Sequence, residues 1–139
     1  MRRGRTTCGA ALAALCAAVA LAGCSGARDT GEGRKIEALV KRFALAHGPD
    51  ACDLLTTKAL VKLYAGGRGT LAAGRAGCIA RSRRFEGQRV DVTFVKFRTA
   101  HSAHATARTP DGRRYYQVGV EKHHGRWLVD SVSSIARPG

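Results

Sequence analysis

Residues 116–132, YQVGVEKHHGRWLVDSV, decide the fold of this chain. Apolar residues occupy every second position over 116–120, and this alternation is typical of a strand with one buried face. The triplet HHG at 123–125 would turn the chain, and apolar residues return over 127–132. The stretch therefore predicts two antiparallel strands joined by a tight turn.

Two more strands are expected upstream of this hairpin. The apolar alternation over 90–97 changes phase near Phe94, which predicts a strand with a β-bulge. Alanines at alternate positions over 103–107 predict a second strand, and PDG at 110–112 has the composition of a turn. Together with the hairpin, these segments predict an antiparallel meander.

The residues before the meander have helical spacing instead. An apolar stripe over 36–44 predicts one helix, which the pair GP at 48–49 would end. Asp50 is the expected N-cap of a short second helix, and Thr57 is the expected N-cap of a third. Residues 69–84 are expected to form a loop with a short helix. Helices followed by antiparallel strands predict an α+β fold, with N-terminal helices packed on a curved antiparallel β-sheet.

The N-terminal 23 residues have the pattern of an export signal. Arginines within positions 2–5 precede an uncharged stretch whose centre, 10–22, is apolar. That centre is too short and too rich in alanine to favour a membrane-spanning helix, which needs about 20 strongly apolar residues. A cleaved signal peptide over 1–23 is the better interpretation.

The segment LAGC at 21–24 then resembles the bacterial lipobox. This resemblance implies that Cys24 is acylated and becomes the mature N-terminus on the extracytoplasmic face of the cell membrane. Residues 24–34 would be a flexible tether, and 35–139 the folded domain. The alternatives are ordinary signal cleavage at an Ala-x-Ala site within 20–22, or an uncleaved anchor.

The cysteines agree with export. Cys8 and Cys16 would leave with the signal peptide and Cys24 would carry lipid, so Cys52 and Cys78 remain. Outside the cytoplasm these two can pair, and closing such a loop stabilises a domain by about 3 to 4 kcal/mol in the chain-entropy model. Two buried thiols are the alternative.

Three stretches, ACDLL at 51–55, GC at 77–78 and GRWLVDSV at 125–132, resemble the small NTF2-like secreted bacterial lipoproteins. The resemblance implies a cystatin-like α+β cone over about 34–135, in which a curved sheet wraps around helices and often leaves a pocket. Such a pocket would be lined by Phe43, Tyr64, Phe94, Tyr116 and Trp127. The alternative is that these aromatic side chains simply fill the core.

Carboxylates that could catalyse a reaction in the pocket are scarce. Asp91 lies between two valines and Asp130 beside another, so both are expected to face solvent if the valines face the core. Isomerases of the NTF2-like group need an acidic base inside an apolar cavity. We therefore expect no catalytic residue.

The histidines and serines do not form a recognisable site. His101 and His104 would point to opposite faces of an extended segment, and His123 and His124 would diverge at a turn. The sequence has no zinc-ligand spacing and no serine-nucleophile motif, so neither a metal nor a cofactor is expected.

Length and charge limit the remaining choices. The chain has 139 residues, with 24 Lys and Arg against 10 Asp and Glu and a formal net charge of +14. One domain fits this length, which excludes a multidomain enzyme.

Export and the lack of aromatic residues among the basic ones exclude a nucleic-acid partner. Anionic lipid head groups are the expected contact of the basic cluster, with a solvated arginine-rich face as the alternative. The cluster comprises Arg81, Arg83, Arg84, Arg113 and Arg114.

These observations predict a lipid-anchored extracytoplasmic binding or interaction module, without catalytic activity, that holds a small apolar ligand or an envelope protein. One alternative is an isomerase, cyclase or hydratase that uses the cone pocket. Another is a structural envelope protein that forms a homodimer through its sheet.

Overall fold

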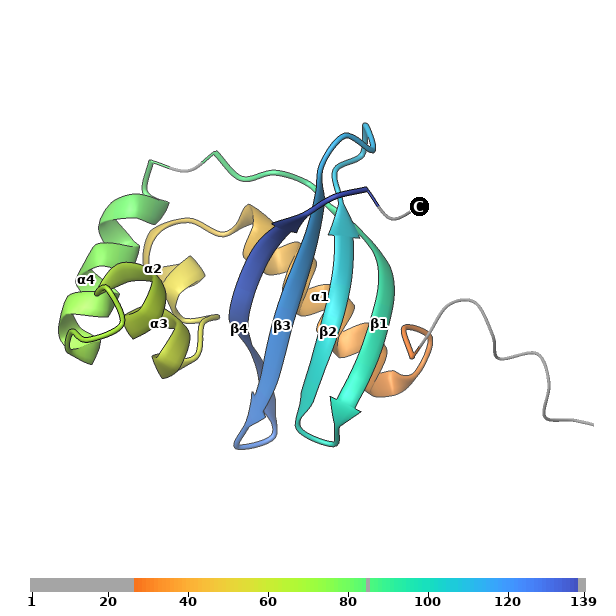
Figure 1. Cartoon of the computed structure of the whole chain (residues 1–139), viewed down its shortest axis with the longest axis horizontal. Coiled ribbons are helices and arrows are strands. Elements are labelled where there is room, and N and C mark those ends of the chain that lie inside the picture. Colours follow the sequence, from red (N-terminus) through yellow and green to blue (C-terminus); the bar gives the residue numbers. More distant parts are fainter. Residues whose placement is uncertain (1–26, 85, 138–139) are drawn as a thin grey trace, which may run out of the picture.

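The computed structural model describes residues 27–84 and 86–137 (Figure 1). The expected signal peptide and the expected lipid acceptor Cys24 lie outside the described residues. Four helices are followed by four strands in this part of the chain. The helices are α1 (Gly31–Leu45), α2 (Gly48–Cys52), α3 (Thr57–Tyr64) and α4 (Leu71–Ser82). The strands are β1 (Asp91–Thr99), β2 (Ser102–Arg108), β3 (Tyr115–His123) and β4 (Arg126–Ile135).

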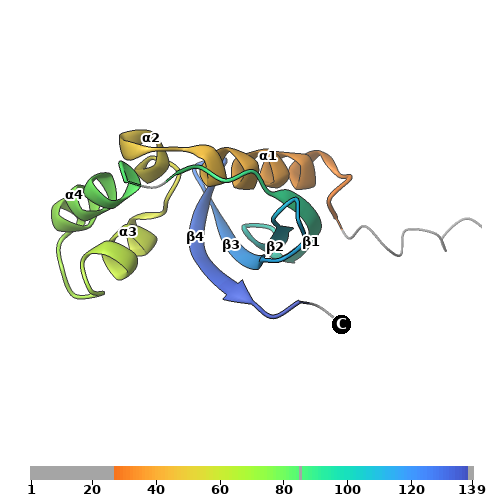
Figure 2. The ribbon, with the colours of Figure 1, turned by 90° about the horizontal axis from the view of Figure 1, so that it is seen from above.

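The strands form one antiparallel sheet in the order β1-β2-β3-β4. Helix α1 crosses one face of this sheet, called the inner face here, while α3 and α4 stand beyond the edge strand β4 (Figure 2). The predicted α+β class and the predicted meander are therefore confirmed.

The inner face of the sheet carries the core. Alternate residues of β2, namely Ala103, Ala105 and Ala107, are buried on it. Ile36 and Val40 of α1 are buried in the same core. Because alanine projects only a methyl group, the helix can approach β2 closely.

Two β-bulges set which side chains face inward. The predicted bulge in β1 is confirmed by a register shift between Val92 and Phe94. A second irregularity opposite Gly119 and Val120 leaves Asp130 of β4 as an extra residue. Because of the first bulge, Phe94 pairs with Thr106 on the outer face and is 39% exposed.

Helix α1 begins at Gly31, inside the segment expected to be a tether. Its N-cap is Thr30, whose hydroxyl accepts a hydrogen bond from the backbone N–H of Gly33. The backbone N–H of Ala27 donates to the carbonyl of Val95 on the free edge of β1, at 2.9 Å. A Cβ at Gly33 would lie 1.9 Å from the carbonyl oxygen of Ala27, so this close approach requires glycine. Residues 27–34 are thus packed against the domain.

Helix α2 starts three residues earlier than the sequence predicts, and α3 one residue earlier. Helix α2 begins at Gly48, with His47 as its N-cap and Asp50 already inside the first turn. Pro49 is tolerated there because the first N–H groups of a helix have no intrahelical acceptor. Thr56, rather than Thr57, caps α3.

Helix α4 is longer than the loop and short helix expected over 69–84. Thr70 caps it, and it continues for 12 residues despite two internal glycines. A Cβ at Gly74 would lie 2.7 Å from the carbonyl oxygen of Leu60, and one at Gly77 would lie 2.8 Å from that of Tyr64. The glycines that weaken the helical pattern in the sequence are therefore what allows α4 to pack against α3.

A disulfide joins α2 to α4, between Cys52 and Cys78. Both cysteines are buried, with exposures of 1% and 0%. The helices are also tied to the sheet, because Leu55 forms a parallel bridge with Val129 on the free edge of β4. In that bridge the N–H of Thr56 donates to Val129 and the N–H of Val129 donates to Leu54.

We expect the double substitution Cys52→Ala and Cys78→Ala to lower the free energy of unfolding by about 3 to 4 kcal/mol. The reason is that the disulfide spans 26 residues and restricts the unfolded chain. Urea unfolding followed by circular dichroism measures the change. Reductant should destabilise the unsubstituted protein by a similar amount and leave the variant unaffected, and an unfolding midpoint insensitive to reductant would contradict the expectation.

Candidate functional site

A cavity of about 520 Å³ lies between the helices and the inner face of the sheet. Its helical wall comes from the second half of α1 and from α2, α3 and α4, and its other wall from β2, β3 and β4 and from the segment that leads into β1. The volume is within the usual range of small-molecule sites, about 300 to 1,000 Å³.

The wall of the cavity is mainly apolar. Val40 and Val118 form buried parts of it, while Leu63 and Val132 are each 38% exposed. Clusters of partly exposed large apolar side chains often mark a binding site. The cavity therefore opens to solvent between α3 and the C-terminal part of β4.

Three of the five aromatic residues expected to line a pocket do so. Phe43, Tyr64 and Tyr116 line the cavity. Phe94 does not, because the β1 bulge turns it to the outer face. Trp127 is buried on the inner face near the first residues of α1, where its ring lies 6.0 Å from that of Phe97.

The expected basic cluster is divided by the fold. Arg81 and Arg114 line the cavity, and the Arg81 guanidinium lies 5.7 Å from the centre of the Tyr64 ring. All five residues are exposed, but Arg83, Arg84 and Arg113 are not among the residues that line the cavity. The sequence places all five in two short runs and does not distinguish the two groups.

A carboxylate missed by the sequence analysis lies near the opposite end of α1. One oxygen of Glu32 accepts from Lys122 Nζ at 2.8 Å and from Trp127 Nε1 at 2.7 Å, and the other accepts from Lys35 Nζ at 2.7 Å. These donors, with Lys122 first, lower the pKa of Glu32 from 4.5 to about 2. The residue was missed because it falls in a glycine-rich polar segment that was expected to be a tether.

Glu32 is poorly suited to act as a general base. A base works best with a pKa near the operating pH, and this carboxylate holds its proton only in strong acid. It borders a wide, open hollow of about 810 Å³ between the start of α1 and the β1–β2 hairpin. Its hydrogen bonds with Lys122 and Trp127 instead fasten α1 to β3 and β4.

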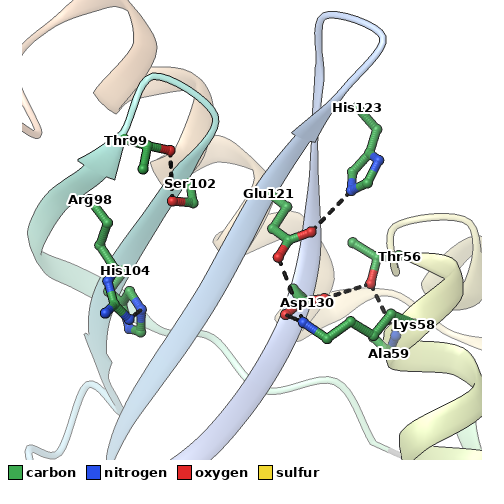
Figure 3. Close-up of polar contacts among 10 residues, drawn as sticks. All are labelled: Thr56, Lys58, Ala59, Arg98, Thr99, Ser102, His104, Glu121, His123 and Asp130. Carbon is green, nitrogen blue, oxygen red and sulfur yellow. Dashed lines mark hydrogen bonds and ion pairs between the residues drawn. The ribbon is translucent and has the colours of Figure 1, made fainter.

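The two aspartates considered in the sequence are not in the cavity. Asp91 is exposed at the start of β1. Asp130 accepts from the Thr56 hydroxyl at 2.9 Å and from Lys58 Nζ at 3.0 Å (Figure 3). The Asp130 carboxylate, together with Glu121 at 3.7 Å, raises the pKa of the Lys58 ammonium, and the contacts of Asp130 attach α3 to the sheet.

The histidines of the strands and their turns are dispersed over the sheet, and His47 caps α2. His104 Nε2 lies 3.1 Å from Arg98 Nη1, and His123 Nε2 lies 3.2 Å from a Glu121 oxygen (Figure 3). His124 is in the β3–β4 turn with φ 49°. Over residues 27–84 and 86–137, no three His, Cys, Asp or Glu side chains gather as metal ligands would.

Comparison with known proteins leaves the chain without an assigned relative. No family model, curated protein or solved structure matches it. Among the described helices, none has the length and apolar character needed to cross a membrane.

We expect Glu32→Gln to reduce the pH dependence of stability in acid. The folded-state pKa lies below the ordinary value of 4.5, so ionised Glu32 stabilises the fold fully above pH 4.5 and loses this effect as the pH falls towards about 2. The urea midpoint of the unsubstituted protein should fall over this range. The midpoint of the variant should be lower at neutral pH and change less.

Glu37→Gln is the matched control, because Glu37 lies on the same helix and forms only an i,i+4 pair with Lys41. Such surface pairs contribute little to stability. Equal effects of the two substitutions at every pH would contradict the role given to Glu32.

Proposed function

We propose that this chain is an extracytoplasmic bacterial lipoprotein with an NTF2-like domain that binds a small apolar ligand in its cavity and does not catalyse a reaction. The observation that carries the proposal is the cavity of about 520 Å³ with a largely apolar wall that opens at Leu63 and Val132. Its position between α1 and the sheet is where the NTF2-like cone would hold a ligand.

The polar groups around the cavity favour binding over catalysis. Within the described part of the chain, the side chains that line it include no carboxylate and no histidine. The hydroxyl of Ser82 donates to the backbone carbonyls of Cys78, at 2.7 Å, and Gly48, at 3.1 Å. An isomerase, cyclase or hydratase would need an acid or base at the reacting atoms.

The outer face of the sheet favours a binding module over a protein that dimerises through this face. The β2 and β3 residues that point outward include Ser102, His104, Gln117 and Glu121. Phe94 is the only large hydrophobic side chain there that is exposed beyond a third of its area, among residues 27–84 and 86–137. Stable homodimer interfaces are usually richer in apolar surface.

Anchoring rests on the segment LAGC at 21–24. We expect Cys24→Ser to abolish acylation and release the protein from the membrane of a bacterial host, because the thiol that accepts the lipid is removed. Membrane fractionation and intact mass show this. Cys16→Ser, within the expected signal peptide, is the control and should leave acylation unchanged. A Cys24→Ser protein that stays in the membrane would contradict the lipoprotein proposal.

Ligand binding is tested with Nile red, a neutral apolar dye. We expect the Cys24→Ser chain, which carries no covalent lipid, to bind the dye with increased fluorescence. Adding Val132→Trp should weaken binding by about tenfold or more, equivalent to about 1.4 kcal/mol, because indole would fill the opening.

Ser133→Trp is the matched control, since Ser133 is the next residue of β4, is exposed, and pairs with Gln117 on the outer face. Circular dichroism should show that both variants are folded. No dye binding, or equal loss in both variants, would contradict the proposed function.

A further inference from the structure

We infer that the ligand is a single-chain amphiphile with an acidic head group, whose chain lies in the cavity and whose head lies against Arg81 and Arg114. This inference rests on the proposed function and adds the chemical class of the ligand. It follows from which charged side chains the fold brings to the cavity and which it leaves elsewhere.

The charges at the cavity have one sign. Arg81 comes from the last turn of α4 and Arg114 from the residue before β3, so each wall of the cavity contributes one arginine. The described lining residues include no acidic side chain to balance them. The neutral polar groups nearby, among them Tyr64, Tyr116 and Gln88, can also donate hydrogen bonds to an anion.

Neither guanidinium has an anionic partner within the described residues. Arg81 makes no salt bridge and instead lies over the Tyr64 ring. Arg114 forms hydrogen bonds through its backbone, with its N–H donating to the Thr109 hydroxyl and its carbonyl accepting from the Thr109 N–H. Several other cations of the domain are paired, including Lys58, Arg75 and Lys122.

The neighbouring arginines show that this placement is specific to two positions. Arg113 lies 3.8 Å from a carboxylate oxygen of Asp111 in the β2–β3 turn and is strongly exposed. Arg83 caps the C-terminus of α4 and does not line the cavity. The two runs of arginine therefore each contribute one side chain to the cavity and keep another outside it.

The apolar wall and the two cations select the head group. An apolar chain gains about 0.8 kcal/mol for each CH₂ removed from water, so the cavity alone favours any chain that fits. A neutral head would leave the arginines solvated and add little. A carboxylate or phosphate accepts the planar, bidentate hydrogen bonds of guanidinium, which are stronger than neutral ones. A cationic head would be repelled.

The test compares decanoate, decyl phosphate, decanol and decyltrimethylammonium, which share one chain and differ in the head. Each compound is titrated, below the concentration at which it forms micelles, against Nile red bound to the Cys24→Ser chain. We expect decanoate, decyl phosphate or both to compete at concentrations about tenfold or more below decanol, and decyltrimethylammonium to be weaker than decanol. Comparison of the two acids shows whether the natural head is carboxylate or phosphate. Added salt should weaken the acids only.

Matched arginine variants locate the head group. The double variant Arg81→Gln, Arg114→Gln should weaken decanoate or decyl phosphate about tenfold or more beyond any loss it causes for decanol and Nile red. The double variant Arg83→Gln, Arg113→Gln removes the same amount of charge from neighbouring positions outside the cavity. It should have little effect on the binding of decanoate or decyl phosphate. Melting followed by circular dichroism checks that both variants are folded.

Three results would overturn the inference. If decanol competes as well as the acids while Nile red binds, the cavity is a ligand site but selects no acidic head. If the two arginine pairs weaken the acids equally, the effect is general surface charge. If Nile red itself does not bind, the proposed function fails together with this inference.

Discussion

The fold depends on how one apolar sheet face is covered. Helix α1 has 15 residues and therefore extends for only about 22 Å, and the alanines of β2 let it approach the sheet closely. The remaining helices are held at the β4 edge by the Leu55–Val129 bridge and to each other by the disulfide. Because α1 crosses the face while α3 and α4 stand beyond its β4 edge, the space between them is left as the cavity (Figure 2).

The strands could be predicted from the sequence because alternation is a local property. The helix boundaries were harder to predict from the sequence where tertiary contacts override the local helix preference. Gly74 and Gly77 argue against a long helix when they are considered alone, yet both are needed for α4 to approach the backbone of α3. Thr30 and Glu32 likewise begin a helix in a segment whose glycines indicated a tether.

The site could be predicted only in part for a related reason. Phe43, Tyr64 and Tyr116 follow helical or strand periodicity into the cavity, whereas one extra residue in β1 moves Phe94 to the other face. The two arginines of the cavity each have an arginine within two positions that lies outside it. Sequence adjacency cannot separate such neighbours, because the direction of each side chain depends on the packing of distant elements.

Under the proposed acylation of Cys24, the hydrogen bond from Ala27 to Val95 would limit how far the domain can lie from the bilayer. Only two residues separate Cys24 from Ala27, so an acylated Cys24 would lie within about 11 Å of the free edge of β1. The β1 edge would then be the part of the sheet nearest the lipid, with α3 and α4 beyond the opposite edge strand (Figure 1).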